Sequence, residues 1–131
     1  MKKHLTNLAF SFLLSIYSMI GFSKAADIGF LKSVDRKPAL VVISANWCVP
    51  CKIVHKWMEE DVDIKRLLEN YDVKHYDFDV DKNMVKKYNV DRIPFFAVVS
   101  DGKEVARKFG ISSGKSGLEI FLRAYMPRGS K

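Results

Sequence analysis

At 131 residues, of which 48% are apolar, the chain has room for one domain with a buried core. Its formal net charge is +7, but residues 1–25 contain three lysines and no acidic residue, so the remainder carries only +4. Those remaining basic residues are interspersed with acidic ones and no groove-reading motif is present, which argues against a nucleic-acid-binding protein.

The first 25 residues have the three-part layout of a secretory signal peptide. Lys2 and Lys3 precede an apolar run over 8–22, and the small residues in Ser23-Lys24-Ala25 predict cleavage after Ala25. The alternative is a retained membrane anchor, although serines interrupt the run and it is shorter than the ~20 apolar residues of a spanning helix. No cysteine lies near the cleavage position, which excludes a lipoprotein. We therefore expect a periplasmic or secreted protein in an oxidising compartment, anchored to the inner membrane only if this segment is kept.

The next part of the chain predicts a strand that leads into a pair of cysteines. Residues 26–35 have apolar side chains at three-residue spacing, which predicts a short helix. Residues 39–44 form an apolar, mainly β-branched run that is typical of a strand covered on both faces. Pro50 suits the first turn of the helix that follows, and the helical spacing continues to residue 68 with a kink near 59–63.

The second half of the chain predicts a mixture of short strands and helices that ends in a hairpin and a helix. Asp101-Gly102 between two strand-like segments is a strong hairpin signal, so these two strands should be antiparallel. In chain order we expect a strand over 73–80, a short helix over 83–88, strands over 95–99 and 103–109, and a helix over 114–126.

Cys48 and Cys51 are the only cysteines in the sequence, and their spacing marks a candidate redox dithiol. A purely structural disulfide is one alternative, but a bridge that closes such a small loop gains little from chain entropy. A metal site is another, because Cys48, Cys51 and His55 have a spacing that can ligate copper or zinc. With only three candidate ligands, a solvent-facing helix histidine is the commoner explanation for His55. Lys52 occupies the position where a c-type haem site needs histidine, which excludes that cofactor.

The sequence resembles the thioredoxin family from about Ala39 to the C-terminus. Four features carry the resemblance: Trp47-Cys48-Val49-Pro50-Cys51 after an apolar strand, Val80-Asp81, Ile93-Pro94 at the start of a later strand, and the Asp101-Gly102 hairpin. The resemblance implies an α/β domain over 26–131 with the thioredoxin fold, in which helices flank a central mixed sheet of four to five strands.

The resemblance also implies the residues of the site. Cys48, with its sulfur exposed at the positive end of a helix, is the expected nucleophile, and Cys51 is the expected resolving residue. Pro94 matches the family's cis-proline, which leaves the backbone of Ile93 free to pair with an extended substrate. The expected substrate-binding residues are Trp47, Val49, Pro50, Ile93 and Pro94.

Three positions depart from the family's pattern. Val42 replaces the buried aspartate that is thought to accept the proton of the second cysteine. Asp77 aligns with the family's nearby lysine, and we interpret it as a surface residue. Val49 replaces a glycine and is expected to narrow the range of partners. The proton acceptor for Cys51 is therefore not identified by the sequence.

These observations predict a thiol:disulfide oxidoreductase that uses Cys48 and Cys51 and binds no cofactor. We expect it to reduce disulfides in exported proteins or to relay electrons to them. Its partners would be disulfide-containing or dithiol proteins and an upstream electron donor in the membrane. The alternative function is a metal-binding or metallochaperone module that uses Cys48, Cys51 and His55.

Overall fold

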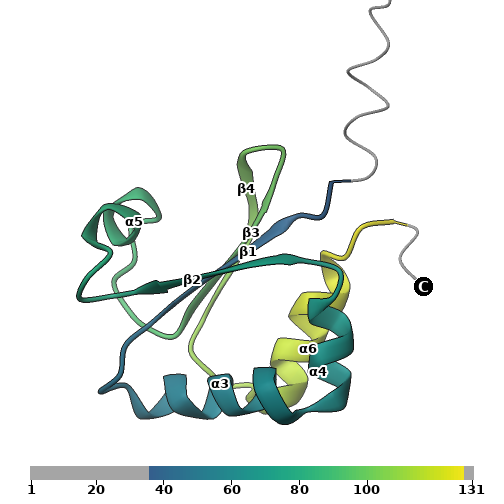
Figure 1. Ribbon diagram of the computed structural model, residues 1–131, viewed down its shortest axis with the longest axis horizontal. Coiled ribbons are helices and arrows are strands. Elements are labelled where there is room, and N and C mark those ends of the chain that lie inside the picture. Colours follow the sequence, from purple (N-terminus) through teal and green to yellow (C-terminus); the bar gives the residue numbers. More distant parts are fainter. Residues whose placement is uncertain (1–35, 129–131) are drawn as a thin grey trace, which may run out of the picture. The chain divides into compact units, whose positions relative to one another are not determined.

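The computed structural model of the chain describes residues 36–128 (Figure 1). The expected signal segment and the expected helix over 26–35 lie outside these residues. Within residues 36–128, no helix combines the length and the apolar character that crossing a membrane requires.

Four strands form one mixed sheet in the order β2-β1-β3-β4. Their bounds are Ala39–Ser44 for β1, Asp72–Asp77 for β2, Phe95–Ser100 for β3 and Lys103–Phe109 for β4. The apolar β1 is central, because it pairs in parallel with β2 and antiparallel with β3. The expected hairpin is confirmed: β3 and β4 are antiparallel, and Asp101 and Gly102 have φ angles of 51° and 76°, the left-handed pair that suits a two-residue turn.

The side chains of β1 alternate between two hydrophobic clusters, one on each face of the sheet. On one face, Leu40 and Val42 pack with residues of α3 (Val49–Glu60), α4 (Val62–Leu68) and α6 (Gly114–Ala124). On the other face, Val41 and Ile43 pack with β3 and with the segment around α5 (Lys82–Lys87). Figure 1 shows α3, α4 and α6 together on one side of the sheet and α5 apart from them. The prediction that β1 is covered on both faces is thus confirmed.

The kink expected near residues 59–63 is a break between α3 and α4 at Asp61. The backbone of Asp61 is extended, with φ −79° and ψ 121°. Its Oδ1 accepts hydrogen bonds from the amides of Asp63 and Ile64, each at 3.1 Å. Asp61 therefore caps α4 at its N-terminus, where helix amides lack partners within the helix.

The strand expected over residues 73–80 was too long, since β2 ends at Asp77. The Asp77 Oδ1 accepts hydrogen bonds from the amides of Asp79 at 2.7 Å and Val80 at 3.1 Å, which closes a turn. An aspartate that bonds nearby amides in this way competes with the strand ladder. As a result Val80 lies outside the strand and is 78% exposed.

Candidate active site

Cys48 and Cys51 form a disulfide at the junction between β1 and α3. Cys48 is the N-cap residue of α3, and its Sγ accepts a hydrogen bond from the amide of Cys51 at 3.2 Å. Pro50 occupies the first turn of the helix, as expected. The Cys48 sulfur therefore lies at the positive end of the helix dipole, where a thiolate is stabilised.

The two cysteines differ in how solvent reaches them. Cys51 is 1% exposed and Cys48 is 5% exposed, and both pack with Ala45, Phe78 and Ile93. The expectation that Cys48 is openly exposed is therefore wrong for the disulfide form, because Phe78 and Ile93 close around the pair. Cys48 nevertheless lines a cavity of about 430 Å³, whereas Cys51 does not. A partner would thus meet Cys48 first.

This cavity gathers most of the residues expected to bind substrate. Trp47, Val49, Pro50 and Ile93 line it together with Cys48, and its remaining walls are Phe78, Asp91 and Arg92. Pro94, the residue after Ile93, does not line the cavity and is fully buried, and the Ile93–Pro94 peptide bond is cis, as the resemblance implied. The carbonyl of Pro94 accepts a hydrogen bond from the amide of Gly110 at 2.8 Å, which ties this edge to the end of β4.

Trp47 is held by a contact that the sequence did not predict. The residue is 64% exposed, and its Nε1–H donates to the Asp79 Oδ2 at 2.7 Å. Asp79 lies in the turn that follows β2, the turn that Asp77 closes. The turn therefore orients an aromatic side chain at the rim of the cavity, far along the sequence from the residue that it holds.

Val42, at the position where the family has an aspartate, is surrounded by apolar side chains. Val42 is fully buried in the cluster that Leu40, Val54 and Phe96 share with it. Asp77 does not take over this buried position, since it is only half-buried and its Oδ1 accepts hydrogen bonds from the amides of the turn. Among the described residues, no polar or charged side chain is fully buried, and the apolar side chains that pack with the disulfide are those of Ala45, Phe78 and Ile93.

His55 lies one helical turn after Cys51 and faces the sheet rather than open solvent. It is half-buried, and its Nε2 lies 3.0 Å from the Oγ of Ser44, the last residue of β1. Its ring stacks on that of His75 from β2, with centroids 5.5 Å apart and planes at 29°. Burial lowers the pKa of His75, and the charge of His55 lowers it further, while Glu59 opposes the shift. The sequence had indicated a solvent-facing His55 and only a strand residue at 75.

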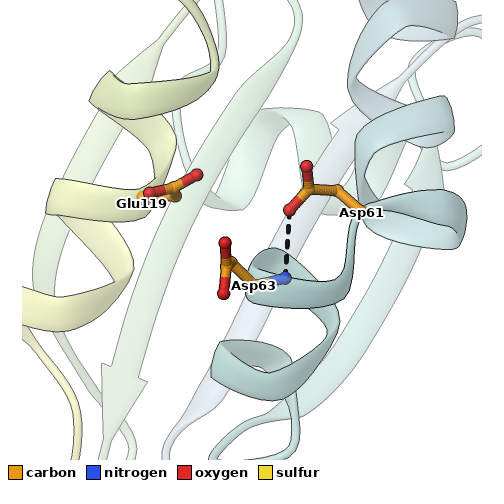
Figure 2. A group of neighbouring side chains, drawn as sticks. All are labelled: Asp61, Asp63 and Glu119. Atoms are coloured by element: carbon orange, nitrogen blue, oxygen red, sulfur yellow. Dashed lines mark hydrogen bonds between the residues drawn. The ribbon is translucent and has the colours of Figure 1, made fainter.

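The metal ligands considered from the sequence do not come together in the described part of the chain. Cys48, Cys51 and His55 are not among the groups of potential ligand atoms that lie within 4.8 Å of one another there. The side chains that do so are Asp61, Asp63 and Glu119, at the contact of α4 with α6 (Figure 2). Lys115 already forms ion pairs with this cluster, since its Nζ lies 2.6 Å from the Asp61 Oδ2 and 3.4 Å from the Glu119 Oε1.

Lys115 and the helix cap together explain the acidic cluster. The hydrogen bond from Lys115 and the amide of Ile64 hold the pKa of Asp61 below its ordinary value. The same contact with Asp61 raises the pKa of Lys115. The carboxylates therefore fasten α6 to the start of α4, on a different part of the domain from the disulfide.

Comparisons with known proteins agree with this geometry. The family model described as Thioredoxin matches residues 22–124. A thioredoxin from Mycobacterium tuberculosis is 33% identical over 106 residues, which cover 79% of this chain and 89% of that protein. A thioredoxin H-type from Fagopyrum esculentum is 30% identical over 92 residues, or 68% of each chain. The solved structure of Fasciola hepatica thioredoxin superposes with a TM-score of 0.58 at 26% identity, covering 77% of this chain and 93% of that one.

Proposed function

Because the chain belongs to the thioredoxin family, and is accordingly a thiol:disulfide oxidoreductase, we propose that it reduces disulfides in exported proteins. Cys48 is the proposed nucleophile and Cys51 the proposed resolving residue. The observation that carries this assignment is the asymmetry of the pair. The Cys48 Sγ caps α3 and lines the cavity, while Cys51 lies behind it, almost without solvent contact.

The reaction has two exchange steps. The Cys48 thiolate first attacks one sulfur of the substrate disulfide, so that a mixed disulfide forms and the other substrate sulfur leaves as a thiolate. The Cys51 thiolate then attacks the Cys48 Sγ and releases the second substrate sulfur. The substrate gains two electrons and two protons, and the protein is left with the Cys48–Cys51 disulfide. An upstream dithiol donor must then reduce that disulfide, which is the role we assign to a membrane electron donor.

The cavity supports a substrate with an extended, mainly apolar segment next to its disulfide. Trp47, Val49 and Pro50 form one apolar wall beside Cys48, and Ile93 faces them from the segment before the cis-proline. We propose that the backbone of Ile93 pairs with the substrate chain. The exposed side chain of Val49, 65% accessible, adds bulk next to Cys48 and would disfavour substrates whose disulfide is deeply recessed.

The exported location rests on the N-terminal sequence. The lysines at positions 2 and 3, the apolar run over 8–22 and the small residues that end at Ala25 support secretion with cleavage. Expression in a bacterium, followed by cell fractionation and N-terminal sequencing, tests this. We expect a periplasmic product that begins at Ala26. A product that keeps Met1 and remains in the membrane fraction would favour the anchor, and one in the cytosol would contradict export.

Two measurements test the reductase activity itself. The purified protein should reduce insulin disulfides in the presence of a dithiol, and Cys48→Ser should abolish this activity. In Cys51→Ser the mixed disulfide cannot be resolved, so substrates should remain attached to Cys48 and be recovered from cells. Insulin reduction that survives in Cys48→Ser would contradict the assignment of the nucleophile.

A further inference from the structure

The second exchange step needs a group that takes the proton of Cys51. A thiol in apolar surroundings holds its proton tightly, and only the thiolate attacks a disulfide. Cys51 is 1% exposed and packs with Ala45, Phe78 and Ile93. Val42 offers no proton acceptor, and the Oδ1 of the half-buried Asp77 already accepts hydrogen bonds from the turn amides. A base on the buried side of α3 would fill this role.

His55 is the titratable side chain nearest to Cys51 along this side of α3, with Glu59 one turn further on. Cys51, Val54 and Met58 form the buried stripe of the helix, and His55 stands within it, four residues after Cys51. Side chains at this spacing are neighbours on a helix surface. A helical side chain also leans toward the N-terminus and covers the preceding turn. His55 therefore lies on the same side of α3 as Cys51, one turn further along the helix.

The ring of His55 is fixed by two contacts from the sheet. The Ser44 Oγ lies 3.0 Å from its Nε2, and the His75 ring stacks on it with centroids 5.5 Å apart. The two contacts come from neighbouring strands: Ser44 ends the central strand β1, and His75 lies in β2, which pairs with β1 in parallel. A base held on both sides in this way needs little reordering when it accepts a proton.

We propose that His55 is the proton acceptor for Cys51 during resolution of the mixed disulfide, and that Ser44 orients its ring. This inference rests on the proposed function, since it assigns a residue to the second step of that reaction. In the tautomer that this proposal requires, the His55 Nε2–H donates to the Ser44 Oγ and the Nδ1 lone pair is free to accept the proton of Cys51. The transfer is direct or passes through a single water.

The step balances without any further reactant. The S–H bond of Cys51 breaks and its proton passes to the His55 Nδ1, giving an imidazolium. The Cys51 thiolate attacks the Cys48 Sγ, the Cys48–Cys51 bond forms, and the bond from Cys48 to the substrate breaks. The departing substrate thiolate takes a proton from solvent or from the imidazolium. His55 is neutral again when the product has left.

The groups around His55 determine how this step depends on pH. Glu59 on α3 and His75 on β2 line the same pocket as His55, and β1 contributes the uncharged Ser44. Because a protonated His55 cannot accept a proton, resolution should slow as the pH falls through the range in which histidines titrate.

A reaction with dithionitrobenzoate separates the two exchange steps. Attack by Cys48 on this probe releases a first thionitrobenzoate, and attack by Cys51 on the mixed disulfide releases a second. In stopped-flow experiments His55→Gln should keep the first phase and slow the second by about 100-fold, the lower end of what a positioned base contributes. The acidic limb of the second phase should also disappear. Lys56→Gln is the matched control, because Lys56 is the exposed neighbour of His55 on α3 and should change neither phase.

Two further variants keep the test decisive if His55→Gln folds poorly. Ser44→Ala leaves the imidazole but removes its hydrogen bond, so the second phase should slow by less than in His55→Gln. His55→Glu supplies a different base and should restore much of the rate, with the acidic limb moved to lower pH. A second phase in His55→Gln within twofold of wild type at every pH would overturn the proposal. If the wild-type protein shows no first phase at all, so that Cys48 does not attack the probe, the proposed function itself would be contradicted.

Discussion

Replacing Val42 with aspartate should strongly destabilise the domain at pH 7. Val42 is fully buried among Leu40, Val54 and Phe96, and an ionised carboxylate is very unfavourable in such surroundings, so the new side chain must take up a proton on folding. An ordinary aspartate has a pKa near 3.9, about three units below pH 7, so this protonation costs about 4 kcal/mol. Losing the buried valine adds about 1.5 kcal/mol or more. The sum is comparable with the total stability of a small domain, roughly 5–15 kcal/mol.

The pH dependence of this cost tests its origin. At pH 4.5, only about half a unit above the ordinary aspartate pKa, the protonation cost falls to about 1 kcal/mol and the variant recovers about 3 kcal/mol relative to wild type. Val42→Asn is the control, since its penalty should not change between the two pH values. Urea unfolding at pH 7 and pH 4.5 measures both variants. A penalty for Val42→Asp below about 1 kcal/mol at pH 7 would refute the reasoning. The carboxylate would then be ionised and paired, for example with His75, the β2 partner of this position.

Three further predictions concern a buried hydroxyl, the stacked histidine and the rim of the cavity. Tyr71→Phe removes the donor to the Leu122 carbonyl and should cost about 1–3 kcal/mol in urea unfolding. Because burial raises the pKa of Tyr71 to about 12, wild-type stability should fall as the pH rises from 10 toward 12, and a variant with the same fall would contradict this. Burial also lowers the pKa of His75. The contribution of the neutral His75 ring to the free energy of unfolding should therefore be complete above about pH 6.5 and be lost as the pH falls through the lowered value. His75→Phe should therefore lose less stability in acid than wild type, and an unchanged acid profile would count against it. Asp79→Ala removes the acceptor of the Trp47 indole and should raise KM for a protein disulfide about fivefold, while the reaction with a small disulfide stays the same. An equal effect on both substrates would mean that the hydrogen bond does not act through substrate binding.

Local sequence patterns predicted most of the fold because each element is determined by its own residues. The β-branched run at 39–44 suits a central strand, Pro50 suits the first turn of a helix, and Asp101-Gly102 suits a tight turn. The end of β2 was not predicted. Asp77 lies within an alternating sequence that predicts a strand continuing to residue 80. Only in the folded chain do the amides of residues 79 and 80 reach its carboxylate.

The same limit applies to the candidate site. The cysteine spacing predicted the disulfide, and the motif at Ile93-Pro94 predicted the cis bond beside it. The surroundings of His55 could not be read from the sequence, because Ser44 and His75 come from different strands and meet the helix only across the sheet. The i,i+4 spacing of Cys51 and His55 is the signal that the sequence offers, and the same spacing is compatible with a metal-binding pattern.

The reduction potential of the Cys48–Cys51 couple tests the central claim most directly. The purified protein is equilibrated with glutathione buffers of defined ratio, and the fraction of free thiol is measured by alkylation. A reductase should have a potential at or below that of the cytosolic glutathione pool, about −220 to −260 mV, and near the value of about −270 mV for thioredoxin. A potential near the −120 mV or so of a strong disulfide oxidant would contradict the account, because the protein would then transfer its disulfide to substrates instead of reducing theirs.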